Sequence, residues 1–381
     1  MISTPTIEIV LTGDLVLSLP DPDPLFSHSM PLFERADVLI GHVEIPHTVR
    51  PTAIYGLSAP ADAVDPSHLN ALGRAGFDIA TLAGNHLFDS GPAGVEDTIA
   101  ALRSQGIKTT GAGMNIGEAR LPAIIEKKGI SVGVLSYNCV GPKLSWATHN
   151  KAGAAYIEII TQYGLDYESP GGPPSATYSF AEPVTLGAMV ADIEALRKQV
   201  HVVVVALHKG IGHVPATLAM YEQQVTRAAV DAGADIVVGH HAHLLRGVET
   251  YKGKPIFHGL NNYVTVTRQL SVNAVENTNP VRMAWAKKRR ELFGFEPDPT
   301  YPTYPFHPEA KNTMAAICVA GPAGVQNAGF IPCWIEPDGS PRPLGNDAKG
   351  QEVAEYVGSI NEKAGLKADL KWQGDRVLFL G

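Results

Sequence analysis

The sequence predicts an α/β fold, and two observations lead to that prediction. Short runs rich in β-branched residues recur along the 381-residue chain, and patterns with helical spacing lie between them, for example at residues 94–105 and 218–232. A glycine follows each of these two patterns, at Gly106 and Gly233, where helices usually stop. Strands that alternate with helices in this way indicate an α/β core.

Six β-branched runs are the predicted strands of this core. They are residues 7–11, 38–40, 79–82, 132–136, 202–207 and 236–238. The first run contains an acid, Glu8, and no basic residue precedes it. We therefore expect this run to be a strand rather than a secretion signal.

Two stretches interrupt the alternation of strands and helices, at residues 141–183 and 275–312. Both are rich in aromatic residues and proline, and we expect them to be long, loop-rich insertions that either cover a site or pack as surface loops. The basic run at 287–290 is expected to be a solvated helix face. Residues 329–381 predict a strand, a turn and a tail helix. The whole chain, 1–381, is expected to form one domain.

The composition narrows the classes of protein to which the chain can belong. With 45% hydrophobic and 18% charged residues, it is typical of a globular protein. The net charge of -8 argues against nucleic acid as the main partner. No run of about 18 apolar residues predicts a membrane span. Three separated cysteines, Cys139, Cys318 and Cys333, are expected to be reduced thiols of a cytoplasmic protein. We expect a small-molecule partner, and homo-oligomerisation stays open.

The strongest functional signal is a set of polar residues that follow the predicted strands. They are Asp14, Glu44, Asn85, His208, His241 and His243. Because the carboxyl ends of strands form the ligand crevice of open α/β sheets, we expect these side chains to converge. Imidazoles and carboxylates are ligands that suit Zn, Mn or Fe. The sequence therefore predicts a catalytic metal site.

Each of these residues also has a structural explanation when it is taken alone. Asp14 and Asn85 follow glycines and could serve as turn residues, and His208 could be a hydrogen-bonded core histidine. Their occurrence together at strand ends favours a functional site. His241 and His243 alternate, so in an extended segment their rings would point to the same side.

Five motifs resemble those of the CapA, or poly-γ-glutamate capsule synthesis, family of calcineurin-like metallophosphoesterases. They are Gly13-Asp14, His42-Val43-Glu44, Asn85-His86-Leu87-Phe88-Asp89-Ser90-Gly91, His208-Lys209-Gly210 and Gly239-His240-His241-Ala242-His243. The third, with Gly84 before it, resembles the GNH box of these phosphoesterases, and the last resembles their GHxH box. The resemblance covers most of residues 7–265. It implies a four-layer α-β-β-α sandwich with the two insertions added.

The resemblance also implies two divalent metal ions and a role for each motif residue. Asp14 and His243 would bind one metal, and Glu44 would bridge both. The ligands of the second metal would be Asn85, His208 and His241. The catalytic histidine would be His86, oriented by Asp89, which would accept its other N–H.

Two departures from the family pattern change what the resemblance implies. The Asp-x-His opening of calcineurin-like phosphoesterases lacks its histidine at residues 14–16, as in the CapA family generally, and His42 stands where that family has asparagine, which makes it a further candidate ligand. At residues 208–213 the family usually has tryptophan and an acid, so substrate contacts differ here. The candidate substrate-binding residues near the motifs are Lys209, His213, Arg246 and His240.

The implied chemistry is hydrolysis by a water that two metals activate, with attack on a phosphoryl or carbonyl centre. The bond stays open between phosphoester and amide or ester, because the cations near the motifs are few. The aromatic insertions favour an organic substrate with apolar surface. The alternative is a non-catalytic accessory role in assembly of the poly-γ-glutamate capsule polymer. Family members are usually membrane-anchored or exported, and neither an anchor nor a signal is expected here.

Overall fold

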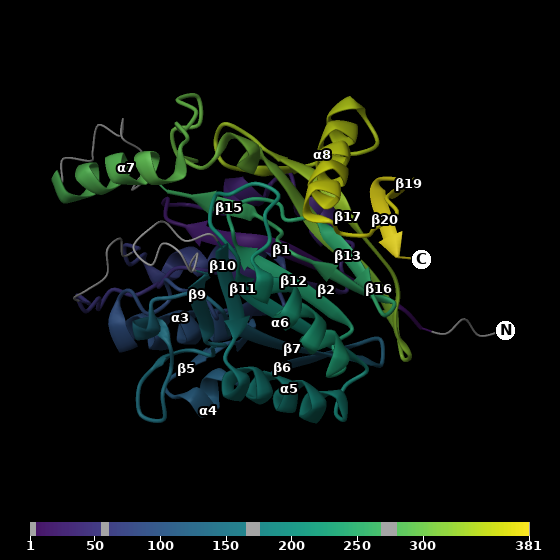
Figure 1. Ribbon diagram of the computed structural model, residues 1–381, viewed down its shortest axis with the longest axis horizontal. Helices are drawn as coiled ribbons and strands as arrows, with labels where there is room; N and C mark the ends of the chain where they lie inside the picture. The colour runs from purple at the N-terminus through teal and green to yellow at the C-terminus, as the bar shows by residue number, and fades with distance from the viewer. Residues whose placement is uncertain (1–4, 55–60, 165–175, 268–279, 381) are drawn as a thin grey trace.

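Two β-sheets pack against each other in the computed structural model, which describes residues 5–54, 61–164, 176–267 and 280–380 (Figure 1). Within these residues the larger sheet has ten strands and the smaller has six. Helices cover the outer face of each sheet. The arrangement confirms the prediction of a four-layer α-β-β-α sandwich.

The larger sheet has a parallel half and an antiparallel half. The parallel half consists of β1 (Ile7–Leu17), β2 (Val38–Val43), β3 (Ile79–Thr81), β4 (Lys108–Thr110) and β15 (Asn262–Val266). The antiparallel half consists of β16 (Asn312–Gly321), β17 (Gly324–Ile335), β18 (Pro341–Pro343), β19 (Lys371–Gln373) and β20 (Arg376–Leu380). The order is β19-β20-β17-β16-β1-β2-β3-β4, with β15 beside β1 and β18 beside β17.

The smaller sheet is parallel in its centre and antiparallel at both edges. In spatial order its strands are β13 (Val248–Tyr251), β14 (Lys254–Phe257), β12 (Ile236–His241), β11 (Val202–Lys209), β7 (Ile130–Asn138) and β6 (Ala123–Lys127). Two small ribbons lie outside both sheets. They pair β5 (Ala112–Gly113) with β8 (Gly153–Ala154), and β9 (Ile159–Gly164) with β10 (Ala176–Ala181).

The helices divide between the two sheets. On the larger sheet pack α1 (Met30–Phe33), α2 (Asn70–Ala75) and α3 (Gly91–Ser104), and on the smaller sheet pack α4 (Ile116–Ala119), α5 (Pro183–Arg197) and α6 (Met220–Asp231). Near β16 and β17 lies α8 (Ala348–Ala364), whereas α7 (Pro280–Phe293) lies apart at one end (Figure 1). Short 3-10 turns are η1 (Asp23–Phe26), η2 (Pro66–Leu69), η3 (Lys143–Ser145) and η4 (Pro308–Lys311). None of the described helices has both the length and the apolar composition that a membrane span requires.

The strands of the core are apolar on both faces, since each face packs against another layer. In β11, Val202 and Val204 belong to the apolar cluster between the two sheets, whereas Val203 and Val205 belong to the cluster beneath α5 and α6. Successive side chains of a strand point to opposite faces, so a continuous β-branched run is buried on both sides. This burial explains why such runs identified the strands in the sequence.

The structure confirms the six predicted strands and both predicted helices, and it extends several of them. Because β1 and β11 are longer than predicted, Asp14 and His208 lie inside strands rather than after them. The insertions contain regular elements beside their loops, namely the β9–β10 ribbon and α7. Their residues 165–175 and 275–279 lie outside the described residues. The tail helix is α8, and the chain continues from it into the unpredicted β19–β20 hairpin.

A bulge in β1 places Asp14. β1 pairs with β16 through Leu11 and with β15 from Asp14 onward, and its register against β2 shifts between these two residues. The amide of Asp14 donates to the carbonyl of Asn261 at 3.0 Å. A Cβ atom on Gly13 would lie 1.9 Å from that same carbonyl oxygen. The bulge therefore requires glycine where the two backbones meet.

We predict that Gly13→Ala lowers the free energy of unfolding by about 2 kcal/mol or more, because the added methyl group separates β1 from Asn261. The control is Gly187→Ala in α5, where nothing lies within 4 Å of an added Cβ. That change should be neutral or stabilise by up to about 1 kcal/mol. Urea unfolding measures both variants, and equal stability of the two would contradict the close approach.

Candidate metal centre

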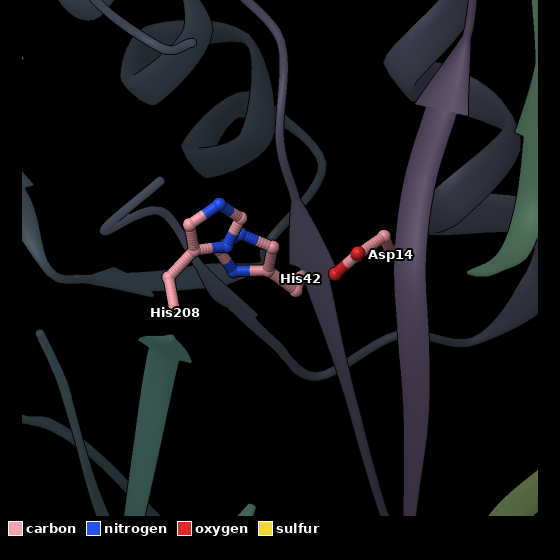
Figure 2. A group of neighbouring side chains, drawn as sticks. All are labelled: Asp14, His42 and His208. Atoms are coloured by element: carbon pink, nitrogen blue, oxygen red, sulfur yellow. The ribbon is translucent and has the colours of Figure 1, made fainter. Parts of the chain in front are cut away.

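Three side chains from three strands meet where the two sheets come together (Figure 2). Asp14 comes from β1, His42 from β2 and His208 from β11. The ring centroids of the two histidines lie 4.8 Å apart, and the Asp14 carboxylate points toward His42. One potential ligand atom from each of the three residues lies within 4.8 Å of the others. The cluster therefore draws its side chains from both sheets.

Glu44, which follows β2, and two histidines at the end of β12 extend the cluster. Oε1 of Glu44 lies 3.9 Å from Nε2 of His208 and 3.7 Å from Nε2 of His243. Two further groups of three have ligand atoms within 4.8 Å of one another. They are Glu44 with His208 and His241, and Asp14 with Glu44 and His243. Because the groups share members, they form one continuous cluster.

The polar atoms of this cluster are buried, and many have no partner. The exposed fraction is 0% for Asp14 and His42 and 2% for Glu44. The atoms without a hydrogen-bond partner among the described residues include Glu44 Oε1, His42 Nε2, His208 Nδ1 and His241 Nδ1. Each such group costs about 1–3 kcal/mol when it is buried unpaired. Divalent Zn, Mn or Fe would satisfy several at once, so these residues fit a metal site.

Burial and neighbouring charges shift the pKa values of the cluster. Burial lowers the pKa of His42 and of His241 to about 3, so both rings are neutral at pH 7. Burial, together with the nearby Asp14, raises the pKa of Glu44 to about 8. Burial alone would raise the pKa of Asp14, but His240, with Nδ1 3.0 Å from Oδ1, and other histidines outweigh it and lower the pKa to about 2. A cation bound beside Glu44 would lower the pKa of this carboxyl group, which would then lose its proton.

The His241–His243 segment differs from the expected extended conformation. His241 has a φ of 86° and His243 a φ of 51°, so both residues adopt left-handed backbone and the prediction of an extended segment is wrong. A backbone hydrogen bond of 2.9 Å from the amide of His213 to the carbonyl of Ala242 connects loop 211–217 to this turn. The two rings are still neighbours, with centroids 6.1 Å apart.

The loop after β3 carries the Asn-His motif into the cluster. Oδ1 of Asn85 lies 2.8 Å from Nε2 of His208. Nδ1 of His86 lies 2.6 Å from Oδ2 of Asp89, and the same oxygen accepts from the amide of Ala61 at 2.7 Å. Desolvation lowers the pKa of His86, but the contact with Asp89 outweighs it, and the pKa is raised. Asp89 thus occupies one ring nitrogen and leaves Nε2 for other partners.

Two candidate substrate-binding residues are held by internal contacts. Lys209 is fully buried, and its Nζ lies 2.8 Å from Oε2 of Glu222 and 3.0 Å from the carbonyl of His258. The guanidinium of Arg246 is also buried and donates to three backbone carbonyls of loop 211–217. These contacts stabilise the fold and give no support to a role in substrate binding.

The other two candidate substrate-binding residues lie against the cluster. The ring of His240 stacks on His42 with centroids 4.6 Å apart, so it lies among the candidate ligands. The ring of His213 stacks on His243 with centroids 5.3 Å apart. His213 therefore borders the side of the cluster that contains His243.

Arg289 of α7 reaches the same region. Its Nη2 atom lies 2.7 Å from Nε2 of His213. Its guanidinium packs over three aromatic rings at 5.7–5.9 Å, those of Phe293, Phe295 and Phe306. The prediction of a solvated helix face at 287–290 is wrong for this residue, because these contacts bury it, whereas the two lysines of the run are exposed.

Sequence reasoning missed the side chains that hold the candidate ligands from behind. Nδ1 of His42 lies 3.0 Å from Oγ1 of Thr81, and Nδ1 of His243 lies 2.7 Å from Oδ1 of Asn262. Threonine is ordinary in a strand, so Thr81 gave no signal. The pair of asparagines at 261–262, where β15 begins, is a sequence signal that could have pointed to Asn262.

We predict that the metal-free protein is less stable at pH 5 than at pH 7. Burial lowers the pKa of His42, His241 and the separately buried His47 from 6.5 to about 3. Below about pH 6.5 the unfolded state therefore binds more protons, and the free energy of unfolding falls. Glu44, with its pKa raised from 4.5 to about 8, acts in the opposite direction, but three imidazoles outweigh one carboxyl.

The expected loss is at least about 2 kcal/mol, since each pKa unit corresponds to about 1.4 kcal/mol. Urea unfolding in the presence of a chelator measures it. A free energy of unfolding that stays constant or rises from pH 7 to pH 5 would show that these imidazoles are not buried as described.

Comparisons with known proteins place the sequence among capsule synthesis proteins. The chain is 27% identical over 245 residues to the PGA biosynthesis protein CapA of Bacillus subtilis (strain 168), which covers 64% of this chain and 57% of that one. It is 29% identical over 203 residues to a probable polyglutamine synthesis accessory protein of Mycobacterium tuberculosis (strain CDC 1551 / Oshkosh), covering 52% and 48%. The chain thus spans about half the length of these relatives.

A solved structure and a family profile complete the comparison. The calcineurin-like phosphoesterase YfkN of Bacillus subtilis aligns at 12% identity over 95% of this chain and 98% of its own, with a TM-score of 0.37. The profile described as bacterial capsule synthesis protein PGA_cap matches residues 8–267, which include all the candidate ligands. The chain belongs to the PGA_cap family of bacterial capsule synthesis proteins.

Proposed function

We propose that the protein is a metal-dependent hydrolase that acts on a small organic substrate. The observation that carries this proposal is the group of buried, unpaired carboxylate and imidazole atoms between the two sheets. Such groups are costly to bury, and their concentration at one point is typical of a functional site. Because the chain spans only about half of its relatives, the proposal rests on this site rather than on their names.

Two overlapping groups of ligands support two metal positions that share Glu44. One group is Asp14, Glu44 and His243, and the other is Glu44, His208 and His241, with Asn85 in contact with His208. When bound, two divalent cations lower the pKa of a shared water and offset the negative charge that develops on the attacked group. His42 groups with Asp14 and His208 and is a further candidate ligand.

His86 is the proposed proton donor. Asp89 accepts its Nδ1–H, which fixes the ring and leaves Nε2 to hold a proton and deliver it to the departing group. Asp89 also raises the pKa of His86, so the ring stays protonated closer to neutral pH. A histidine in this role contributes roughly 10²- to 10⁴-fold to the rate.

The contacts favour an amide or ester substrate over a phosphoester. Phosphate oxygens that the metals do not bind need cationic side chains, and Lys209 and Arg246 are bonded internally. The Arg289 guanidinium, which reaches this region, is likewise held by His213 and by the carbonyl of Pro305. Beside His243, the site offers the aromatic surface of Phe306. Such a lining suits an organic molecule with an apolar part. A panel of amides, esters and phosphoesters assayed with the metal-loaded protein tests this preference.

A second candidate function is a non-catalytic accessory role in capsule polymer assembly. Family membership favours it, since the matched profile is described by capsule synthesis and one relative is named an accessory protein. The two functions differ in turnover. A metal-loaded protein that hydrolyses members of the panel is an enzyme, whereas a loaded protein that is inert toward all of them supports the accessory role.

We also propose a small-molecule partner and a cytoplasmic location. The net charge of -8 disfavours a nucleic-acid partner. The three cysteines are free and buried, as is usual in a reducing compartment. Size measurement in solution would establish whether the protein is a homo-oligomer.

We predict that Asp14→Ala and His241→Ala each lose most of the bound metal, because each removes a proposed ligand. His86→Ala should keep its metal and lose at least about 10²-fold in turnover, because this residue acts on the substrate. Elemental analysis after dialysis measures metal, and the surface variant His201→Ala is the control. Full metal content in both ligand variants would overturn the site, and His86→Ala activity within about threefold of wild type would remove its catalytic role.

We predict that His42→Asn, which restores the residue that the family usually carries, folds normally but lowers activity at least about tenfold, or roughly 1.4 kcal/mol. An imidazole binds these metals more strongly than an amide does, and burial keeps the His42 ring neutral at pH 7, with a lone pair for a metal. Kinetics from pH 6 to 9, with metal content checked, measure the effect. Wild-type kinetics in the variant would exclude His42 from the site.

A further inference from the structure

A chain of hydrogen bonds connects the candidate ligand His243 to the second insertion. Nδ1 of His243 lies 2.7 Å from Oδ1 of Asn262. The side-chain amide of Asn262 donates to the hydroxyl of Tyr304 at 3.0 Å. That hydroxyl donates to the carbonyl of Ala310 at 2.8 Å. Tyr304 and Ala310 both belong to residues 275–312, so the insertion contacts the cluster through this chain.

The carbonyl of Ala310, the last group in this series of hydrogen bonds, determines which atom donates in each of them. A backbone carbonyl only accepts, so Tyr304 must donate its single hydroxyl hydrogen to Ala310. The phenol oxygen then accepts from Asn262, which turns the NH₂ of Asn262 toward Tyr304 and its Oδ1 toward His243. A flipped amide would take the hydroxyl hydrogen and leave two acceptor oxygens, of Tyr304 and Ala310, facing each other at 2.8 Å.

This direction determines the tautomer of His243. Since Oδ1 of Asn262 can only accept, Nδ1 of His243 carries the hydrogen, and the lone pair is on Nε2. Nε2 is the nitrogen that lies 3.7 Å from Oε1 of Glu44, inside the cluster. Nδ1 also lies 3.8 Å from Oδ2 of Asp14, but Asn262 occupies it. Because a ring nitrogen binds a metal only through its lone pair, these hydrogen bonds leave Nε2 as the nitrogen available to a metal.

Packing holds this series of hydrogen bonds in place. Tyr304 is 2% exposed and lies in an apolar cluster with Leu244, Phe306 and Ile335. The carbonyl of Ala310 also accepts from the side-chain amide of Asn261 at 2.7 Å. The Tyr304–Ala310 end of the series is therefore fixed, and Tyr304 has little freedom to turn its hydroxyl away.

We propose that Asn262 and Tyr304 are positioning residues that fix the Nδ1–H tautomer of His243 and thereby set the metal affinity of the site. Within the second insertion, Tyr304 then contributes to the metal centre in addition to bordering it. The effect on affinity rests on the proposed metal-dependent function, whereas the tautomer is a property of the metal-free protein. Partners that orient a metal-binding histidine typically change metal affinity by roughly 10- to 100-fold.

Four variants test the effect on affinity. Tyr304→Phe keeps the ring and removes the hydroxyl, and Asn262→Leu removes the acceptor, so both should bind Zn²⁺ or Mn²⁺ roughly 10- to 100-fold more weakly. Asn262→Asp keeps an acceptor toward His243 and should bind at least as tightly as wild type. Tyr301→Phe is the matched control, because Tyr301 lies in the same apolar cluster but outside the chain.

Chelator competition measures the dissociation constants, and melting of the metal-free variants shows whether each one folds. Weak binding by Tyr304→Phe and Asn262→Leu, with rescue in Asn262→Asp, is the expected result. Wild-type affinity in Tyr304→Phe, or equal loss in the Asp and Leu variants at position 262, would overturn the proposal.

The tautomer provides a test that needs no metal. Long-range ¹H–¹⁵N correlation of histidine-labelled, metal-free protein distinguishes the two tautomers, and the His243 signal is the one lost in His243→Gln. We expect hydrogen on Nδ1, and hydrogen on Nε2 would overturn the proposal. If the wild-type protein bound no metal, the proposed function would fail while this measurement still decided the tautomer.

Discussion

The burial of two carboxyl groups among imidazoles is the constraint on which the rest of the site depends. Asp14 and Glu44 are almost fully buried in one cluster, and the pKa of Glu44 rises to about 8 because burial and the nearby Asp14 disfavour its charge. Charges in this setting need cations or protons to compensate them. Burial lowers the pKa values of four candidate ligands, so their neutral rings offer lone pairs for cations; they are His42, His208, His241 and His243. Without bound metal, the cluster is destabilising, and the fold must maintain it by other contacts.

The contacts that maintain the cluster come from both sheets and from the second insertion. The larger sheet supplies Asp14 through the β1 bulge, and the smaller sheet supplies His208 from β11, so the packing of one sheet on the other brings the ligands together. The second insertion contacts this cluster as well. Tyr304 reaches His243 through Asn262, and Arg289 contacts the histidine that stacks on His243. A change in this insertion can therefore alter the candidate metal centre from a distance.

The sequence was sufficient to predict the core and the cluster, because both follow from local patterns. Buried strands appear as β-branched runs, and residues such as Asp14 and His208 stand out as polar groups within or just after those runs. Contacts between distant residues could not be predicted. Lys209 appeared available until the structure paired it with Glu222, and the hydroxyl of Tyr304 has no sequence signal that links it to Asn262. The left-handed backbone of His241 was also unpredicted, since it arises where the strand turns.

Anomalous diffraction from crystals grown with Mn²⁺ or Zn²⁺ would locate metal ions in the cluster. We expect two anomalous peaks about 3.5 Å apart, a separation typical of two-metal sites. One should lie among Asp14, Glu44 and His243, and the other among Glu44, His208 and His241. The absence of peaks in this cluster at saturating metal, or peaks only elsewhere on the protein, would show that the cluster is not a metal site.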